Sequence, residues 1–231
     1  TTARATVRAG HPLRPGPAPF SIPETDRSRT REVSLGRGER TRQQIIERAA
    51  PLFNRQGFAG ASLSDIMAAT GLQKGGIYRH FESKEELALR AFDHATAIMG
   101  ERFAAALREQ RTAPDRLRAI IEVFRGLVAD APIPGGCPVV NTAIEADDGN
   151  PALRTRARTA MDRLRAMVRR TVEEGVARGE LHPGTDPDVV ATVLISTMEG
   201  AVVMSRLYGD RVHVDRAAEH LERWIEERMC R

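Results

Sequence analysis

Side chains that donate hydrogen bonds or carry positive charge gather between residues 74 and 84. Tyr78, His80 and Lys84 fall at or near predicted helix ends, where donors are well placed to bind phosphate oxygens. Ahead of them, Lys74-Gly75-Gly76 exposes short side chains at one end of a predicted helix, which suits entry into the major groove of DNA. The chemistry that these residues offer is therefore the binding of a polyanion.

Two short predicted helices and a tight turn would present these side chains. One helix begins at Ser62, a further hydrogen-bond donor at a helix terminus, and ends where Thr70-Gly71-Leu72 breaks the helical pattern. The other spans roughly residues 74–81 and is anchored to the core by Ile77 and Phe81. With a third helix in front to hold them, this arrangement predicts a helix-turn-helix.

The helices on either side carry their own start signals. Thr41 and Gln44 form a T-x-x-Q capping box ahead of a helix that Gly57 ends. Ser83-Lys84-Glu85-Glu86 is another capping box, and it opens a long helix that runs to about Glu109.

Apolar residues three and four apart recur through most of the chain, whereas the alternation typical of strands is scarce. The predicted fold class is therefore all-α, with about nine helices. Pro114, Pro151 and Pro187 suit first-turn positions, and Gly179 suits the position after a helix end. The five C-terminal helices are predicted over about residues 114–130, 137–147, 151–178, 186–208 and 214–229.

The charge of this 231-residue chain is unevenly distributed. Residues 1–84 carry 14 Lys and Arg against 7 Asp and Glu, a local charge of +7, whereas residues 85–231 carry 21 against 24, a local charge of −3. A basic N-terminal part favours a polyanionic partner, because clustered cations release the counterions condensed on nucleic acid. We expect a disordered, Pro-rich basic arm over residues 1–39, a helix-turn-helix domain over 40–86 and a ligand-binding and dimerisation domain over 87–231.

The sequence does not indicate a membrane, secreted, disulfide-rich or metal-binding protein. No run of about 18 apolar residues predicts a membrane span and no segment has the pattern of a signal peptide, so we expect a cytoplasmic protein with no membrane partner. Cys137 and Cys230 lie far apart and match no metal-ligand spacing, so no disulfide framework, metal site or cofactor is predicted.

The run from Gly71 to Phe81, GLQKGGIYRHF, followed by Ser83-Lys84-Glu85-Glu86-Leu87, resembles the N-terminal signature of the TetR family of repressors. The preceding helix, with Phe53, Gly57 and Phe58, is similar too. The resemblance implies a three-helix DNA-binding domain, a long fourth helix that leads to a ligand-binding core, and a homodimer formed through the last two helices.

The resemblance also assigns roles to single positions. Phosphate contacts are implied for Tyr78, His80 and Lys84 and, at the start of the first helix, for Thr41 and Arg42, with Ser62 as a further candidate. The reading of base edges would fall to Ser64, Gln73, Lys74, Gly75 and Arg79.

The chain departs from the family pattern at three positions. Gln73 stands where Ser or Thr is common, Gly76 where Thr, Ser or Ala is common, and Met67 where Ala is common. Two adjacent glycines weaken an isolated short helix by about 1 kcal/mol each relative to alanine. They would also permit close approach of the backbone to DNA, so Gly75 and Gly76 both remain candidate DNA-binding positions.

A cavity for a small-molecule inducer is expected among the long helices. Its candidate lining residues, each of which also fits plain core packing, are Phe92, Met99, Phe103, Phe124, Cys137, Asn141, Glu145, Met161 and Leu164. An inward-facing Glu145 would need a partner, either Arg165, a cationic ligand or water.

Apolar faces on the last two predicted helices suit a dimer interface. They comprise Val193, Thr197, Gly200, Ala201 and Met204 on one helix, and Ala218, Leu221 and Ile225 on the other. A symmetric pair would place two recognition helices about 34–36 Å apart, one turn of DNA, which predicts a palindromic operator.

Cys137 follows Pro134-Gly135-Gly136 and is expected at a helix start, where backbone amides can lower the thiol pKa. A buried, inert thiol is the alternative, and Cys230 is expected to be exposed. Two other functional classes stay open: an enzyme with Cys137 as nucleophile and a histidine as base, and a helical adaptor that uses the basic arm on membranes or RNA. Neither has a local signature in the sequence.

Overall fold

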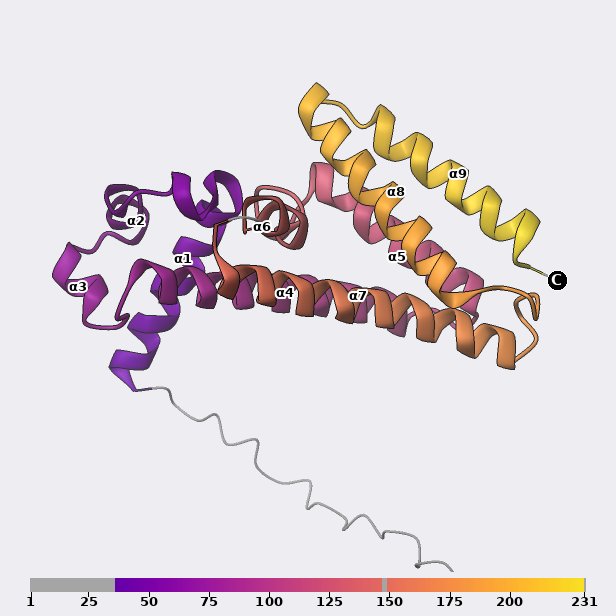
Figure 1. Ribbon diagram of the computed structural model, residues 1–231, viewed down its shortest axis with the longest axis horizontal. Coiled ribbons are helices and arrows are strands. Elements are labelled where there is room, and N and C mark those ends of the chain that lie inside the picture. Colours follow the sequence, from indigo (N-terminus) through magenta and orange to yellow (C-terminus); the bar gives the residue numbers. More distant parts are fainter. Residues whose placement is uncertain (1–35, 147–148, 231) are drawn as a thin grey trace, which may run out of the picture. The chain divides into compact units, whose positions relative to one another are not determined.

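The computed structural model describes residues 36–146 and 149–230 (Figure 1). Within these ranges the chain forms nine helices and no strand, which confirms the all-α prediction. The predicted arm lies outside the described residues except for its last four, and residues 37–39 already belong to the first helix.

The helices follow one another with mostly short connections. They are α1 (Arg37–Gly60), α2 (Leu63–Thr70), α3 (Lys74–Tyr78), α4 (Lys84–Arg108), α5 (Ala113–Ala129), α6 (Pro138–Ala146), α7 (Pro151–Ala177), α8 (Pro187–Tyr208) and α9 (Val212–Arg228).

The start of α1 differs from the prediction. The helix begins at Arg37, so Thr41 lies inside it and donates its hydroxyl to the carbonyl of Arg37 (3.0 Å). A threonine within a helix can bond to the carbonyl four residues back, so the T-x-x-Q spacing alone did not mark a start. Gly57 does interrupt the helix, with φ 77°, but one further turn follows it.

Two other predicted features are only partly correct. Helix α3, predicted to run to Phe81, ends at Tyr78, and a tight turn follows in which the His80 amide donates to the carbonyl of Ile77 (2.9 Å). Ser83 caps α4 by accepting from the Glu86 amide (3.1 Å), yet the Glu86 carboxylate accepts from the amide of Glu82 (2.7 Å), so half of the capping box forms.

The C-terminal helix ends were predicted well. Thr112, Asn150 and Asp186 cap α5, α7 and α8, and a proline occupies the first turn of each of these helices. Gly179, with φ 71°, follows α7 and turns the chain so that Leu181 is fully buried.

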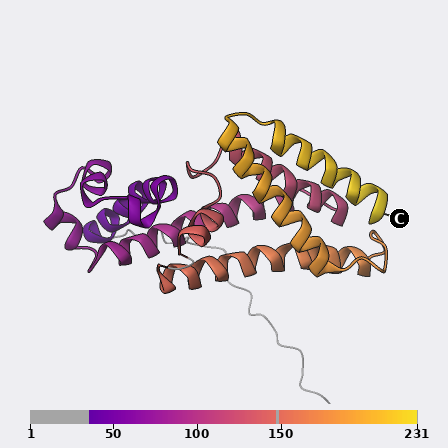
Figure 2. The same ribbon diagram turned by 45° about the horizontal axis from the view of Figure 1, so that its top comes forward.

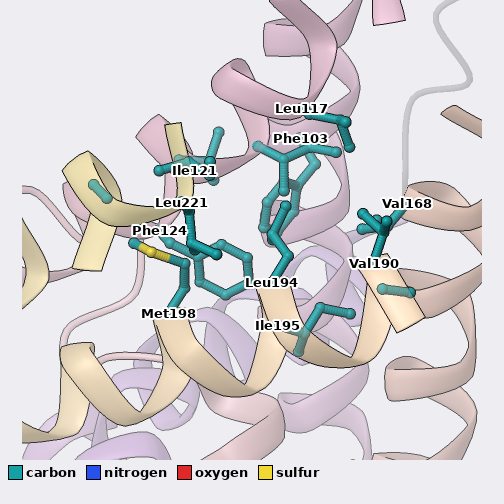
Figure 3. Packing of buried hydrophobic residues seen from close by; sticks show 14 of the residues in the cluster. Phe103, Leu117, Ile121, Phe124, Val168, Val190, Leu194, Ile195, Met198 and Leu221 are labelled. Atoms are coloured by element: carbon teal, nitrogen blue, oxygen red, sulfur yellow. The ribbon is translucent and has the colours of Figure 1, made fainter. Parts of the chain in front are cut away.

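Three apolar clusters hold the described part of the fold, and the two largest lie in its N-terminal and C-terminal helices. The N-terminal cluster packs α1, α2, α3 and the start of α4 together and contains Ile45, Ile46, Ala49, Leu52, Ala61, Ile66, Ile77, Phe81 and Leu87. The larger C-terminal cluster, drawn in part in Figure 3, brings Phe103, Phe124, Val168, Leu194 and Leu221 together from five helices.

The long helices connect these clusters. In both views α4 leads out of the N-terminal helices and runs beside α7, while α8 and α9 lie side by side (Figure 2). Contrary to the sequence expectation, α8 is long and apolar enough to cross a membrane by length and composition alone, although 50% of its apolar stretch is buried in the helical core.

Candidate nucleic-acid interface and ligand-domain clefts

The turn between α2 and α3 is built by a capping box and a glycine. The Ser62 hydroxyl accepts from the Asp65 amide (3.1 Å), and the Asp65 carboxylate accepts from the Ser62 amide (2.9 Å). Donation to its carboxylate from the Ser62 hydroxyl (2.5 Å) and from the Ser62 amide holds the pKa of the half-buried Asp65 below its usual range. Gly71 adopts φ 72°, and its amide donates to Met67 (2.8 Å), which turns the chain sharply toward α3.

Helix α3 is fixed on one side and free on the other. Ile77 and, just after the helix, Phe81 are each 2% exposed within the N-terminal cluster. Lys74, Tyr78 and Arg79 are exposed. This division gives a short helix whose solvent-facing side carries cations and a phenol, as direct contact with DNA requires.

The two glycines of α3 are not required by packing. A Cβ added to Gly75 would meet nothing within 4 Å, and one added to Gly76 would make ordinary contact with Leu72 at 3.5 Å. Gln73 precedes the helix without capping it through its side chain. The open space at Gly75 is thus available to something outside the subunit.

Two lysines are held near aromatic rings of the same unit. Lys84, at the first position of α4, has its Nζ 4.6 Å from the ring centroid of Phe58, and the Nζ of Lys74 lies 6.0 Å from the ring of Tyr78. Such contacts leave ammonium donors available while restricting where they point.

Other predicted DNA-binding side chains are occupied inside the subunit. Arg42 donates to the Glu86 carboxylate (2.9 Å) and stacks 4.7 Å over the ring of Phe81, so it ties α1 to α4. The Thr41 hydroxyl is used within α1. The Ser62 hydroxyl contacts Asp65 (2.5 Å) and lies 2.7 Å from the hydroxyl of the exposed Ser64. His80 is half-buried.

Comparison with known proteins bears on this unit directly. Residues 45–91 match the bacterial regulatory proteins of the tetR family, and residues 113–221 match the tetracyclin repressor-like C-terminal domain. The chain belongs to the TetR family of transcriptional regulators. The match confirms the resemblance seen in the sequence.

Individual relatives support the same assignment for this TetR-family protein. A TetR transcriptional regulator from Chloroflexus aurantiacus is 48% identical, with a TM-score of 0.81 over 84% of this chain and 98% of that one. The transcriptional repressor DhaR of Mycobacterium sp. strain GP1 is 25% identical over 75% of this chain and 86% of its own length. A cysteine mutant of the TetR-family regulator CifR, solved with a 26-base-pair operator, is 25% identical, covers 78% of this chain and 94% of that one, and has a TM-score of 0.68.

The C-terminal half of the TetR-family fold contains two sizeable clefts. One, of about 480 Å³, lies between α4 and α7 and is lined by Met99, Phe103 and Leu164. The other, of about 440 Å³, lies among α6, α7 and α8 and includes Met161 and Glu199.

The remaining predicted cavity residues do not join these clefts. Phe124 is 1% exposed and packs edge-on against Phe103, with ring centroids 5.5 Å apart, so it is core. Phe92 and Glu145 border a small hollow next to α1. The nine predicted residues therefore do not line one cavity.

Cys137 lies at the start of α6, but its environment is the reverse of a reactive one. Burial raises the pKa of the thiol well above its usual range, and the adjacent Glu199 carboxylate adds to this effect. The alternative of a buried thiol is therefore correct. Its polar neighbour is an acid and not a histidine, which gives no support to a nucleophilic enzyme. Cys230 is half-buried, and its backbone pairs with that of Leu181 in an isolated antiparallel β-bridge, so its predicted exposure was wrong.

Helix α6 is bonded directly to α1. Glu145 accepts from the amides of Phe58 (2.7 Å) and Ala59 (2.6 Å), and Asn141 donates to the carbonyl of Asn54 (3.0 Å). A Cβ at Gly57 would lie only 2.6 Å from the Glu145 carboxylate, so glycine permits this close approach. The partner of Glu145 is thus the helical turn after Gly57 rather than Arg165.

The exposed side of α8 carries an apolar stripe. Six of the nine large hydrophobic residues that are exposed lie on this helix: Val189, Val193, Val203, Met204, Leu207 and Tyr208. Gly200 lies on the same face, and a Cβ there would meet nothing within 4 Å. The predicted apolar face of α9 is different, because Ala218, Leu221 and Ile225 are at most 1% exposed and pack inside the subunit. Ala201 is likewise buried.

Sequence reasoning missed Glu199 and Asn54. Glu199 interrupts the apolar run from Val189 to Val203, and this lone acid was a signal that could have been used. Asn54 carried no local signal, because its partners come from the segment before α6 and from α6 itself.

Proposed function

We propose that this TetR-family regulator is a homodimeric repressor that binds a palindromic operator and is released when a small molecule enters its C-terminal half. The observation that carries the proposal is helix α3, buried through Ile77 and exposed through Lys74, Tyr78 and Arg79. Lys84 adds an ammonium group at the start of α4. The operator complex of CifR is a precedent for DNA binding by this fold.

The apolar stripe on the exposed side of α8 supports dimerisation. An apolar stripe of this kind, with Gly200 at its centre, suits close packing against the same helix of a second copy. The outward face of α9 would then contribute polar residues at the edge of the interface.

The contacts between α6 and α1 support a response to a ligand. Asn141 and Glu145 bond α6 to the backbone of α1, and Val140 of the same helix lines the cleft beside α7 and α8. A ligand that shifts α6 would therefore act on the helix against which α2 and α3 pack.

Operator binding at several salt concentrations tests the DNA-binding role. Lys84→Ala should weaken binding to all DNA and lower the salt slope by about one unit, because one phosphate contact is lost. Lys74→Ala should instead relax sequence preference. Arg108→Ala, which removes an exposed cation at the other end of α4, is the matched control and should change neither quantity. If Lys84→Ala behaves like the Arg108→Ala control, Lys84 does not contact phosphate.

A further inference from the structure

A buried acid lies in the cleft formed by α6, α7 and α8. The lining is mostly apolar and includes Val140, Met161, Ala191 and Ile195, with Glu199 as its acidic member. The side chain of Ile195 can be seen on α8 in Figure 3. This mixture of hydrocarbon walls and a buried acid is typical of a site for an organic molecule.

The carboxyl group of Glu199 lacks a strong partner. The residue is 6% exposed, and among the described residues no nitrogen or oxygen atom donates a hydrogen bond to either of its oxygens. The thiol of Cys137, a weak donor, faces it. Burial raises the pKa of Glu199 to about 7.

Neighbouring polar groups are bound elsewhere. Arg165 lines the same cleft, but its guanidinium pairs with Asp188 (3.1 Å). The Ser196 hydroxyl donates to the carbonyl of Thr192 (2.6 Å). Leaving a carboxyl buried without donors is costly, so an external donor would gain a strong, charge-assisted bond there.

We propose that this cleft binds a small organic molecule carrying a primary or secondary ammonium group, with Glu199 as the anchor and the apolar lining around the hydrocarbon part. The unmet need of the carboxylate is for N–H donors, which these amines supply. The binding of this ligand is independent of the function proposed above, but its role as the effector rests on that function.

The position of the cleft fits an effector site. Cys137 immediately precedes α6 and Val140 lies in its first turn, and Asn141 and Glu145 of the same helix hold α1. An occupant between Glu199 and Val140 would therefore contact the helix that is bonded to the DNA-binding unit.

Calorimetry of the full chain without DNA tests the site. The probes are n-hexylamine and 4-phenylbutylamine, each compared with the alcohol of the same skeleton. We expect the amines to bind at least about tenfold more tightly than the alcohols, the advantage of one charge-assisted bond. Glu199→Gln should remove this preference and leave the alcohols unaffected. Glu101→Gln, an exposed acid on α4, is the control and should retain the preference.

The pH dependence gives a second readout. Ionisation of Glu199 should raise amine affinity about tenfold between pH 6 and pH 8, while the amines stay protonated. Cys137 faces Glu199, and burial keeps the pKa of its thiol well above the usual range, so the thiol stays neutral. Arg165 lines the same cleft, with its guanidinium paired to Asp188. Glu199→Gln should abolish the dependence.

Equal affinity of the wild-type protein for amines and alcohols would overturn the proposal, and this comparison holds even if the variant does not fold. Retention of the preference in Glu199→Gln would overturn it too. Adding the amines to the protein–operator complex then separates the two claims. Amine binding without operator release would refute the effector role and leave the site in place.

Discussion

The N-terminal helices α1 to α3 and the C-terminal helices α5 to α9 place their polar side chains differently. In the N-terminal unit the polar groups either point outward, as Lys74 and Arg79 do, or are paired, as Arg42 is with Glu86. The C-terminal half instead buries Glu199 without a strong partner and leaves an apolar face on α8 uncovered. A surface for a long polyanion needs exposed charge, whereas a site for a small molecule and a second subunit needs unmet polar and apolar groups.

Truncation of each core is the strongest way to separate the two regions. Phe81→Ala removes a side chain that is 2% exposed and should cost about 3–5 kcal/mol of unfolding free energy. Because Phe81 belongs to the N-terminal cluster, operator binding should be lost and amine binding kept. Phe124→Ala, with a similar cost in the C-terminal cluster, should have the opposite effect: amine binding should be lost and operator binding kept. Denaturant unfolding combined with both binding assays checks this. Equal loss of both activities in both variants would mean that the regions are not separable.

The next largest effect concerns the exposed face of α8. Gly200→Glu has open space within the subunit, so the subunit should fold, but in a dimer the charge would be buried at a cost of several kcal/mol. Sedimentation velocity should show a monomer. Gly100→Glu makes the same change at another open helical glycine, on α4, and should remain dimeric. A dimeric Gly200→Glu variant would place the interface elsewhere.

Much of the structure of both regions could be predicted from the sequence, but the signals that allowed it differ between them. The DNA-binding unit depends on short-range signals: the capping box at Ser62, the turn at Gly71 and the anchors Ile77 and Phe81. The helix starts at Asn150 and Asp186 could be predicted from the same kind of signal. The roles of single side chains were harder to predict, because Arg42 is neutralised by a residue 44 positions away.

The ligand region depends on contacts between distant segments, which periodicity cannot give. Glu145 bonds to amides 86 and 87 positions away, and Cys137 meets Glu199 from another helix. The apolar residues of α9 had the right spacing for an exposed interface, yet α5 and α8 already cover them. Periodicity identifies an apolar face but does not say which partner covers it.

A smaller effect is expected where the two regions meet. Glu145→Gln keeps one acceptor but turns an amide donor toward the backbone N–H groups of Phe58 and Ala59, which should cost about 1 kcal/mol. Hydrogen exchange of these two amides should become about fivefold faster. Glu47→Gln, at an exposed position on α1, should leave their exchange unchanged. Unchanged protection in Glu145→Gln would show that α6 does not restrain this turn.

The smallest effect is expected on the exposed side of α3. Gly75→Ala fits the open space and should stabilise the helix by about 0.5–1 kcal/mol. If the glycine serves close approach of the backbone to DNA, operator affinity should nevertheless fall. Thermal unfolding and operator titration measure the two quantities separately. Higher stability with unchanged affinity would remove Gly75 from the DNA contact surface.

Selection of bound fragments from random DNA by the full chain tests the central claim most directly. A dimer that reads DNA through two α3 helices should enrich two inverted half-sites whose centres lie about 10–10.5 base pairs apart, and Lys74→Ala should blur them. The absence of any enriched sequence, or enrichment of a lone half-site without symmetry, would contradict a dimeric operator-binding regulator.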